Sequence, residues 1–138
     1  MDIPLLITEQ YPKGLGPTIP EIKDVIPSYA PIEKISFSCC GEPFFLEAVQ
    51  VTGRQQVVLA GMETHVCVLQ TCLDLLKEGF DVHVVSDAVC SRTEQNYRAG
   101  LEFMRDAGAV ISCTETVLFQ LLAKAGTESF KIISKRIK

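Results

Sequence analysis

Short runs of apolar residues alternate along this chain with longer segments whose apolar positions recur at helical spacing. The runs are typical of strands buried on both faces, and the longer segments are typical of helices with one apolar side. We predict strands at 3–8, 56–60, 81–86 and 109–112. We predict helices from 43 onward, at 65–77, at 93–106, from 114 or 116 to 124, and a final amphipathic turn at 129–135. Such alternation indicates an α/β fold, with a mostly parallel, Rossmann-like sheet between two layers of helices.

The segment 9–33 interrupts this regular pattern. It contains five prolines and two glycines, which predict a long irregular loop of the kind that usually has a function. Gly14 and Gly16 lack the third glycine of a dinucleotide-binding loop, and Pro17 and Pro20 stand where the helix of that motif would begin. The segment therefore predicts no dinucleotide site.

Cys67 follows the strand at 56–60 and stands in the first turn of the next helix. Ligands of open α/β folds bind beyond the carboxyl ends of the strands. The backbone N–H groups of a first helical turn and the helix dipole favour a thiolate, the reactive form of cysteine, and the same groups bind an oxyanion. This arrangement predicts a thiol nucleophile. The alternative is that Cys67 is one of several buried structural cysteines.

Length and composition restrict the class of protein. The 138 residues predict a single domain, 1–138, and the net charge of −4 argues against nucleic-acid and membrane-surface partners. No apolar run approaches the roughly 20 residues of a membrane span, and no basic leader precedes the first apolar run. We therefore expect a cytoplasmic protein.

Six cysteines raise the possibility of disulfides or of a metal site. They lie inside apolar strand and helix patterns, so reduced thiols are the better interpretation. The chain has no Cys-x-x-Cys spacing and only two histidines, so we predict neither a structural zinc ion nor any other cofactor.

Four segments together resemble the isochorismatase-like cysteine hydrolases, and among them an uncharacterised subgroup without metal. These segments are TEQYPKG at 8–14, EKISFS at 33–38, GMETHVCVLQT at 61–71 and DAVCSR at 87–92. The resemblance extends from Ile3 to about Lys135. It implies a hydrolase of a small amide-type substrate that forms a thioester intermediate, and it implies the same three-layer α/β/α fold.

The resemblance also implies roles for individual residues. Cys67 is implied as the nucleophile and Lys34 as the lysine that stabilises the thiolate, although a solvated loop lysine is the alternative for Lys34. The backbone N–H groups of Glu63 and Cys67 are implied as the oxyanion hole, following a cis peptide bond between Met62 and Glu63. Four side chains are expected to line a substrate pocket: Gln10, Tyr11, Phe37 and His65.

Two departures from the family pattern change the expected activity. The catalytic aspartate of the family ends its first strand, whereas here Asp2 precedes the first predicted strand and Asp87 matches a structural position. The chain therefore resembles a family member truncated at the N-terminus, without a central strand between 3–8 and 56–60, and we expect impaired activity. The residues at 9–13 also lack the histidine of the nicotinamidase metal cluster.

The missing strand predicts unpaired sheet edges, and hence a homo-oligomer. Two alternatives to the hydrolase are an α/β module without catalytic activity, for oligomerisation or binding, and a thiol redox sensor. The sensor would use Cys67 or the adjacent pair Cys39 and Cys40.

Overall fold

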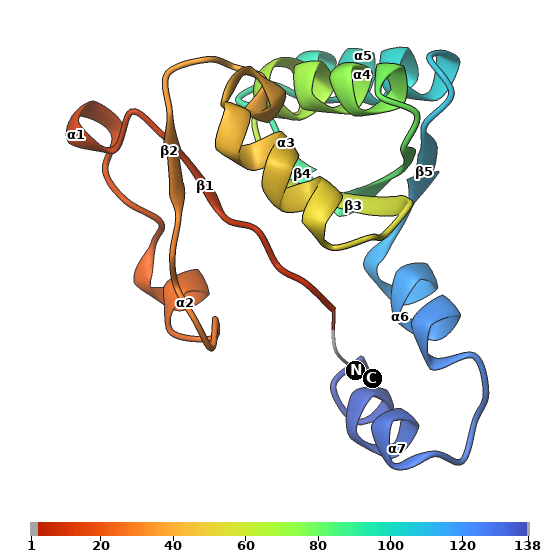
Figure 1. Ribbon diagram of the computed structural model, residues 1–138. Coiled ribbons are helices and arrows are strands. Elements are labelled where there is room, and N and C mark those ends of the chain that lie inside the picture. Colours follow the sequence, from red (N-terminus) through yellow and green to blue (C-terminus); the bar gives the residue numbers. More distant parts are fainter. Residues whose placement is uncertain (1–2, 138) are drawn as a thin grey trace.

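The computed structural model describes residues 3–137, so Asp2 lies outside the described residues. The strands of this part are β1 (Thr8–Gln10), β2 (Ile32–Lys34), β3 (Gln56–Met62), β4 (Asp81–Cys90) and β5 (Val110–Ser112). They form two sheets, one of β1 and β2 and the other in the order β3-β4-β5, and every strand pair is parallel (Figure 1). The α/β architecture with parallel strands is confirmed.

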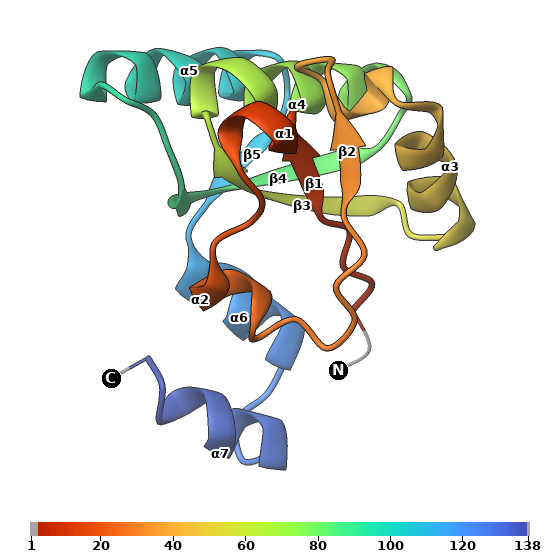
Figure 2. The same cartoon turned by 90° about the vertical axis from the view of Figure 1, so that its left-hand side faces the viewer.

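Helices connect successive strands and cover the larger sheet. They are α1 (Pro12–Leu15), α2 (Pro20–Lys23), α3 (Pro43–Val51), α4 (Leu69–Lys77), α5 (Glu94–Asp106), α6 (Thr114–Leu122) and α7 (Glu128–Ser134). Helices α4 and α5 lie on one face of β3 and β4, and α6 lies on the opposite face (Figure 2). None of the described helices has both the length and the apolar character needed to cross a membrane.

The hydrophobic core lies between β4 and helices α3, α4 and α5. Val82 and Val84 are two residues apart on β4 and therefore point to the same face, where both are buried. Cys72 and Leu75 of α4 and Met104 of α5 are fully buried against them. The spacing of three residues between Cys72 and Leu75 places both on one side of their helix. This packing fixes α4, which begins two residues after Cys67.

The first strand differs from its prediction. The apolar run at 3–8 is not paired before Thr8, and Ile3 and Leu5 are 53% and 61% exposed. A strand requires a partner for its backbone N–H and C=O groups, and β1 finds one in β2 only from Thr8 onward. The segment 9–33, predicted as an irregular loop, contains the short helices α1 and α2 and the first two residues of β2.

The two sheets are separate along their adjacent sides. Within residues 3–137, β1 pairs with β2 alone and β3 with β4 alone. One edge of β1 and one edge of β3 are therefore without a partner strand in the described part of the chain. We call this boundary between the two sheets the seam.

Candidate active site

Cys67 lies in a short turn between strand β3 and helix α4. Residues Thr64–Val68 form one π-helical turn, so the helix predicted at 65–77 becomes α-helical only from Leu69. The carbonyl oxygen of Glu63 accepts hydrogen bonds from the N–H groups of Val66 and Val68, at 3.1 and 3.2 Å. We call residues 63–68 the cysteine turn. The Met62–Glu63 peptide bond before it is cis, and the Cys67 side chain is half-buried.

Lys34 ends strand β2 on the other side of the seam. Its side chain is only 4% exposed, and its Nζ donates to Oε1 of Gln10 at 2.5 Å and to the carbonyl oxygens of Ser36 and Phe37 at 3.0 and 2.8 Å. The parallel register of β1 and β2 pairs Gln10 directly with Lys34. All three acceptors are uncharged, so the site surrounds a buried ammonium group with oxygen dipoles.

Gln10 connects Lys34 to Cys67 across the seam. Its Nε2 donates to the carbonyl oxygen of Ile35 at 2.8 Å, which directs the amide oxygen Oε1 toward Lys34. The Cys67 Sγ lies 3.9 Å from the same Oε1. One oxygen atom of β1 therefore contacts both the buried ammonium and the thiol.

A small cavity of about 90 Å³ opens at this point. Its lining comes from both sheets and from the helix after Cys67: Thr8, Gln10, Lys34, Cys39, Leu59, Ala60, Met62, Cys67, Val68 and Thr71. Lys34 is the one charged side chain among the described residues that line it. The cavity therefore combines a thiol, an ammonium group and an apolar wall.

Three residues expected in the pocket lie outside the lining of this cavity. Tyr11 is 50% exposed, has a left-handed backbone conformation with φ of 41°, and stacks its ring against Gly14. Phe37 is 54% exposed and contributes only its carbonyl oxygen, to Lys34. The His65 ring lies 3.0 Å from Ser91, through Nδ1 and Oγ. The structure thus brings together Cys67, Lys34 and Gln10, but not these three side chains.

Two further residues at the cavity were missed in the sequence. Thr71 is buried, and its Oγ1 accepts a hydrogen bond from the N–H of Cys39 at 2.9 Å. The Cys39 Sγ lies 3.4 Å from the Thr8 Oγ1. Thr71 follows Cys67 by four residues and so lies on the same side of the helix, which is a signal that helical spacing offered. Cys39 was singled out in the sequence only as half of an adjacent cysteine pair, and no spacing there places it near Cys67.

Glu9 orders the loop that follows β1. Its carboxylate accepts hydrogen bonds from the Thr18 N–H at 2.6 Å and from the Tyr29 hydroxyl. The bond from the Thr18 backbone, followed by the Tyr29 hydroxyl, lowers the pKa of Glu9. The Lys23 ammonium lies over the Tyr29 ring, 5.0 Å from its centre. These contacts hold the proline-rich loop against the strand that carries Gln10.

Three titratable groups outside the cavity lining also have shifted pKa values: Cys40, Cys72 and Asp87. Burial raises the pKa of the Cys40 and Cys72 thiols to about 11. Asp87 accepts hydrogen bonds from the Thr114 N–H and Oγ1 at 2.7 and 2.9 Å, and the backbone bond lowers its pKa. Asp87 thus caps the start of α6. Among residues 3–137, no three His, Cys, Asp or Glu side chains gather in a way that could hold a metal ion.

Comparisons with known proteins give consistent matches. The family model described as the isochorismatase domain matches residues 1–116. The secreted isochorismatase effector Isc1 of Phytophthora sojae is 44% identical over 142 residues, which cover the whole of this chain and 68% of that protein. The chain spans about two thirds of the length of such curated relatives.

Solved structures match the fold as well as the sequence. The MAR1 ribonuclease structure from Caenorhabditis elegans has a TM-score of 0.88 and 41% identity, covering 96% of this chain and 68% of that one. The YcaC gene product of Escherichia coli, described as an octameric hydrolase of unknown specificity, has a TM-score of 0.82 and 31% identity. That match covers 86% of this chain and 59% of the YcaC chain.

Proposed function

The chain belongs to the isochorismatase domain family, and from this premise we propose that it is a hydrolase whose nucleophile is Cys67. One observation carries the proposal. The Cys67 Sγ and the Lys34 Nζ contact the same oxygen of Gln10, at 3.9 and 2.5 Å, in the wall of one cavity. The two groups therefore meet at a single amide oxygen, which places a positive charge near the sulfur proposed to attack.

We propose a two-step reaction on a small amide. The Cys67 thiolate attacks the carbonyl carbon, and the N–H groups of Glu63 and Cys67 hold the oxyanion that develops. The carbon–nitrogen bond then breaks, the amine leaves with a proton taken from solvent, and a thioester remains on the sulfur. Water hydrolyses the thioester to the acid and regenerates the thiol. No cofactor takes part in this sequence of steps.

The size of the cavity restricts the substrate. A volume of about 90 Å³ gives room for roughly three water molecules, or for an acyl group of a few heavy atoms. Its apolar wall includes Leu59, Ala60 and Val68. We therefore propose a short acyl or carbamoyl group at Cys67, with the leaving amine directed toward solvent. In this proposal Tyr11, Phe37 and His65 contribute to binding only beyond the cavity itself.

Proton transfer is the weak point of the site. No aspartate or glutamate of residues 3–137 lines the cavity, so the described residues offer no carboxylate to act as general acid or base. We propose that this chain forms the thioester but hydrolyses it slowly. The expected result is slow turnover after a fast first step.

A small-molecule substrate is preferred to a nucleic acid. The C. elegans relative is named a ribonuclease, but the present chain has a net charge of −4, which opposes binding to a phosphate backbone. Lys34 is the one charged side chain among the described residues that line the cavity.

We also propose that the chain associates with further copies of itself in the cytoplasm. Exposed apolar side chains occur at Leu5 before β1 and at Val58 on β3, and YcaC of E. coli is described as octameric. The six cysteines are all free thiols, which suits a reducing compartment. The P. sojae relative is named as secreted, and that description belongs to that protein.

The test uses p-nitrophenyl acetate, an activated ester with a small acyl group. We expect a burst of p-nitrophenolate equal to one acyl group per chain, followed by slow turnover, because thioester formation is faster than its hydrolysis. Cys67→Ser removes the burst, whereas Cys90→Ser, at an exposed cysteine, leaves it unchanged. An equal burst in wild type and Cys67→Ser would sink the proposal.

A further inference from the structure

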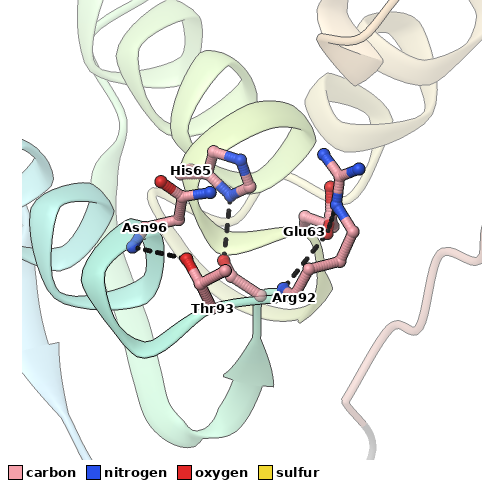
Figure 3. Close-up of polar contacts among 6 residues, drawn as sticks. Glu63, His65, Arg92, Thr93 and Asn96 are labelled. Atoms are coloured by element: carbon pink, nitrogen blue, oxygen red, sulfur yellow. Dashed lines mark hydrogen bonds and ion pairs between the residues drawn. The ribbon is translucent and has the colours of Figure 1, made fainter.

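Two adjacent residues of the loop between β4 and α5 hold the cysteine turn (Figure 3). The Arg92 backbone N–H and its Nε both donate to Oε1 of Glu63, at 3.2 and 2.9 Å. The Ser91 Oγ lies 3.0 Å from Nδ1 of His65. The loop therefore contacts two alternate residues of the turn, and both precede Cys67.

The loop itself has a firm base. Thr93 caps helix α5, and its Oγ1 accepts a hydrogen bond from the Asn96 N–H at 3.2 Å (Figure 3). The Tyr97 hydroxyl donates to the carbonyl oxygen of Ser86 on β4 at 2.8 Å, which ties α5 to the sheet. Ser91 and Arg92 are therefore close to a firmly packed helix, and their contacts hold the cysteine turn in a fixed position relative to that helix.

Helix α5 also touches the backbone of the turn directly. A Cβ atom placed on the buried Gly100 would lie 3.0 Å from the Cα of His65 and 3.2 Å from the carbonyl carbon of Thr64. Such distances leave almost no slack, because backbone atoms rather than flexible side-chain ends form the contact. The middle of the turn is therefore wedged against α5, while Arg92 fixes its first residue.

We propose that Arg92 is a positioning residue that acts through the Glu63 carboxylate to hold the Glu63 N–H in place for the oxyanion. The inference rests on the proposed function, in which that N–H is half of the oxyanion hole. One carboxylate oxygen accepts both donors of Arg92, so the Glu63 residue is pulled toward the loop after β4. Without this anchor, Glu63 is held only through its carbonyl oxygen, which accepts from the Val66 and Val68 N–H groups, and its own N–H is positioned less tightly.

Because the Arg92–Glu63 ion pair is partly exposed, an effect on the chemistry of Cys67 can be separated from an effect on global stability. The Arg92 and Glu63 side chains are 77% and 26% exposed. Ion pairs this open to solvent contribute little to global stability, so removing one should leave the denaturation midpoint nearly unchanged. An effect on the chemistry of Cys67 would then report local geometry.

Two reactions of the Cys67 thiol distinguish a change in the oxyanion hole from a change in the reactivity of the thiolate. With p-nitrophenyl acetate, a sulfur–carbon bond forms, the carbonyl oxygen becomes an oxyanion, and p-nitrophenolate leaves as the carbon–oxygen bond breaks. With iodoacetamide, the sulfur displaces iodide from a CH₂ carbon, so no oxyanion forms. Both reactions consume the thiolate and release its proton to solvent. Their rate ratio at Cys67, read by tandem mass spectrometry, isolates the oxyanion contribution.

The variants are Arg92→Ala, Glu63→Gln and Glu63→Ala. Arg98→Ala is the control, because the Arg98 side chain is 70% exposed, close to the 77% of Arg92, and its ion pair with Glu94 lies on α5 and does not contact the cysteine turn. Full loss of one oxyanion donor costs about 10²–10³-fold, so we expect partial misplacement to slow acylation about tenfold. Alkylation should be unchanged. Glu63→Gln keeps an acceptor for the Arg92 N–H and should lose less than Glu63→Ala.

Other results would overturn either the positioning role of Arg92 alone or that role together with the proposed hydrolase. Arg92→Ala keeps the backbone N–H donor to Glu63, whereas Glu63→Ala removes the acceptor of both bonds. Equal acylation in Glu63→Ala and wild type overturns the positioning role, and so does an equal fall in acylation and alkylation. A loss in Arg98→Ala as large as that in Arg92→Ala also overturns it. A wild-type chain in which Cys67 is alkylated but never acylated instead overturns the proposed hydrolase, and the positioning role with it.

Discussion

The Cys40 thiol should react slowly with alkylating reagents because its pKa is raised, and not only because the side chain is partly buried. It directly follows Cys39 and is only half-buried, so reagents reach it. Burial, followed by the negative charge of Asp74, raises the pKa of its thiol to about 11. The Asp74 carboxylate is itself fixed, because it accepts a hydrogen bond from the Ser38 hydroxyl at 2.5 Å.

The magnitude follows from the fraction of thiolate. At pH 8 a thiol with a pKa of about 11 is ionised in about one molecule in a thousand, against about one in ten for a free thiol with a pKa of 9.0. The folded chain should therefore alkylate Cys40 about 100-fold more slowly than the unfolded chain. Because the thiolate is the nucleophile, the rate in the folded state should rise about tenfold per pH unit from pH 8 to 10.

The assay is timed iodoacetamide labelling, with each cysteine read by peptide mass spectrometry. The same chain in urea is the matched reference, because unfolding removes both burial and the ordered Asp74. Asp74→Asn should speed labelling of folded Cys40 by less than unfolding does, since burial is the larger cause. A folded-state rate that levels off near pH 9, or that equals the rate in urea at pH 8, would refute the reasoning.

Three further predictions concern stability and pH. Leu75→Ala removes a fully buried side chain and should cost about 2–5 kcal/mol in urea unfolding, whereas Val51→Ala, 80% exposed, should cost little; equal midpoints would contradict the assigned core. Thr93→Ala removes the cap of α5 and should cost about 1 kcal/mol in the same measurement, and no loss would mean that the cap adds nothing. The pKa of Glu9 is lowered in the folded state, so its contribution is complete above the unfolded value and is lost as pH falls through the folded one. The Thr18 amide should lose protection from hydrogen exchange in acid, Glu9→Gln should remove that pH dependence, and constant protection in the wild type would rule the linkage out.

The sequence predicted best those elements whose pattern and ends agree. Pro43 marks the start of α3 and Thr93 the cap of α5, and both are observed. Strand β3 starts at Gln56 as predicted and continues to Met62. In these segments local preference and tertiary packing favour the same structure.

The least predictable elements are those defined by pairing. Strand β2 has three residues and includes Glu33 and Lys34, so neither its length nor its polarity indicates a strand. It is a strand because β1 provides a parallel partner. The run at 3–8 shows the reverse case, because its apolar residues lack a partner before Thr8.

The candidate site was predictable in its parts but not in its connection. The position of Cys67 after β3 follows from the strand and helix patterns. The contact of Gln10 with Lys34 depends on the register of β1 and β2, and its contact with Cys67 depends on how the two sheets face each other. No local pattern in the sequence contains that geometry. The roles assigned to these residues stay predictions until the chemistry is measured.

The seam divides the site between two parts of the molecule, of which one has many buried apolar contacts and the other has few. Cys67 belongs to the part that holds most of the buried core, whereas Gln10 and Lys34 belong to a pair of three-residue strands in which Glu9 and Lys34 are the buried side chains. Few buried apolar contacts mean a low free energy of local opening. The β1–β2 pair should therefore exchange its amide hydrogens through openings smaller than global unfolding. Each such opening would separate the Lys34 ammonium from the Cys67 thiol while the cysteine turn remains folded. Activity should therefore be lost at a lower temperature than global unfolding.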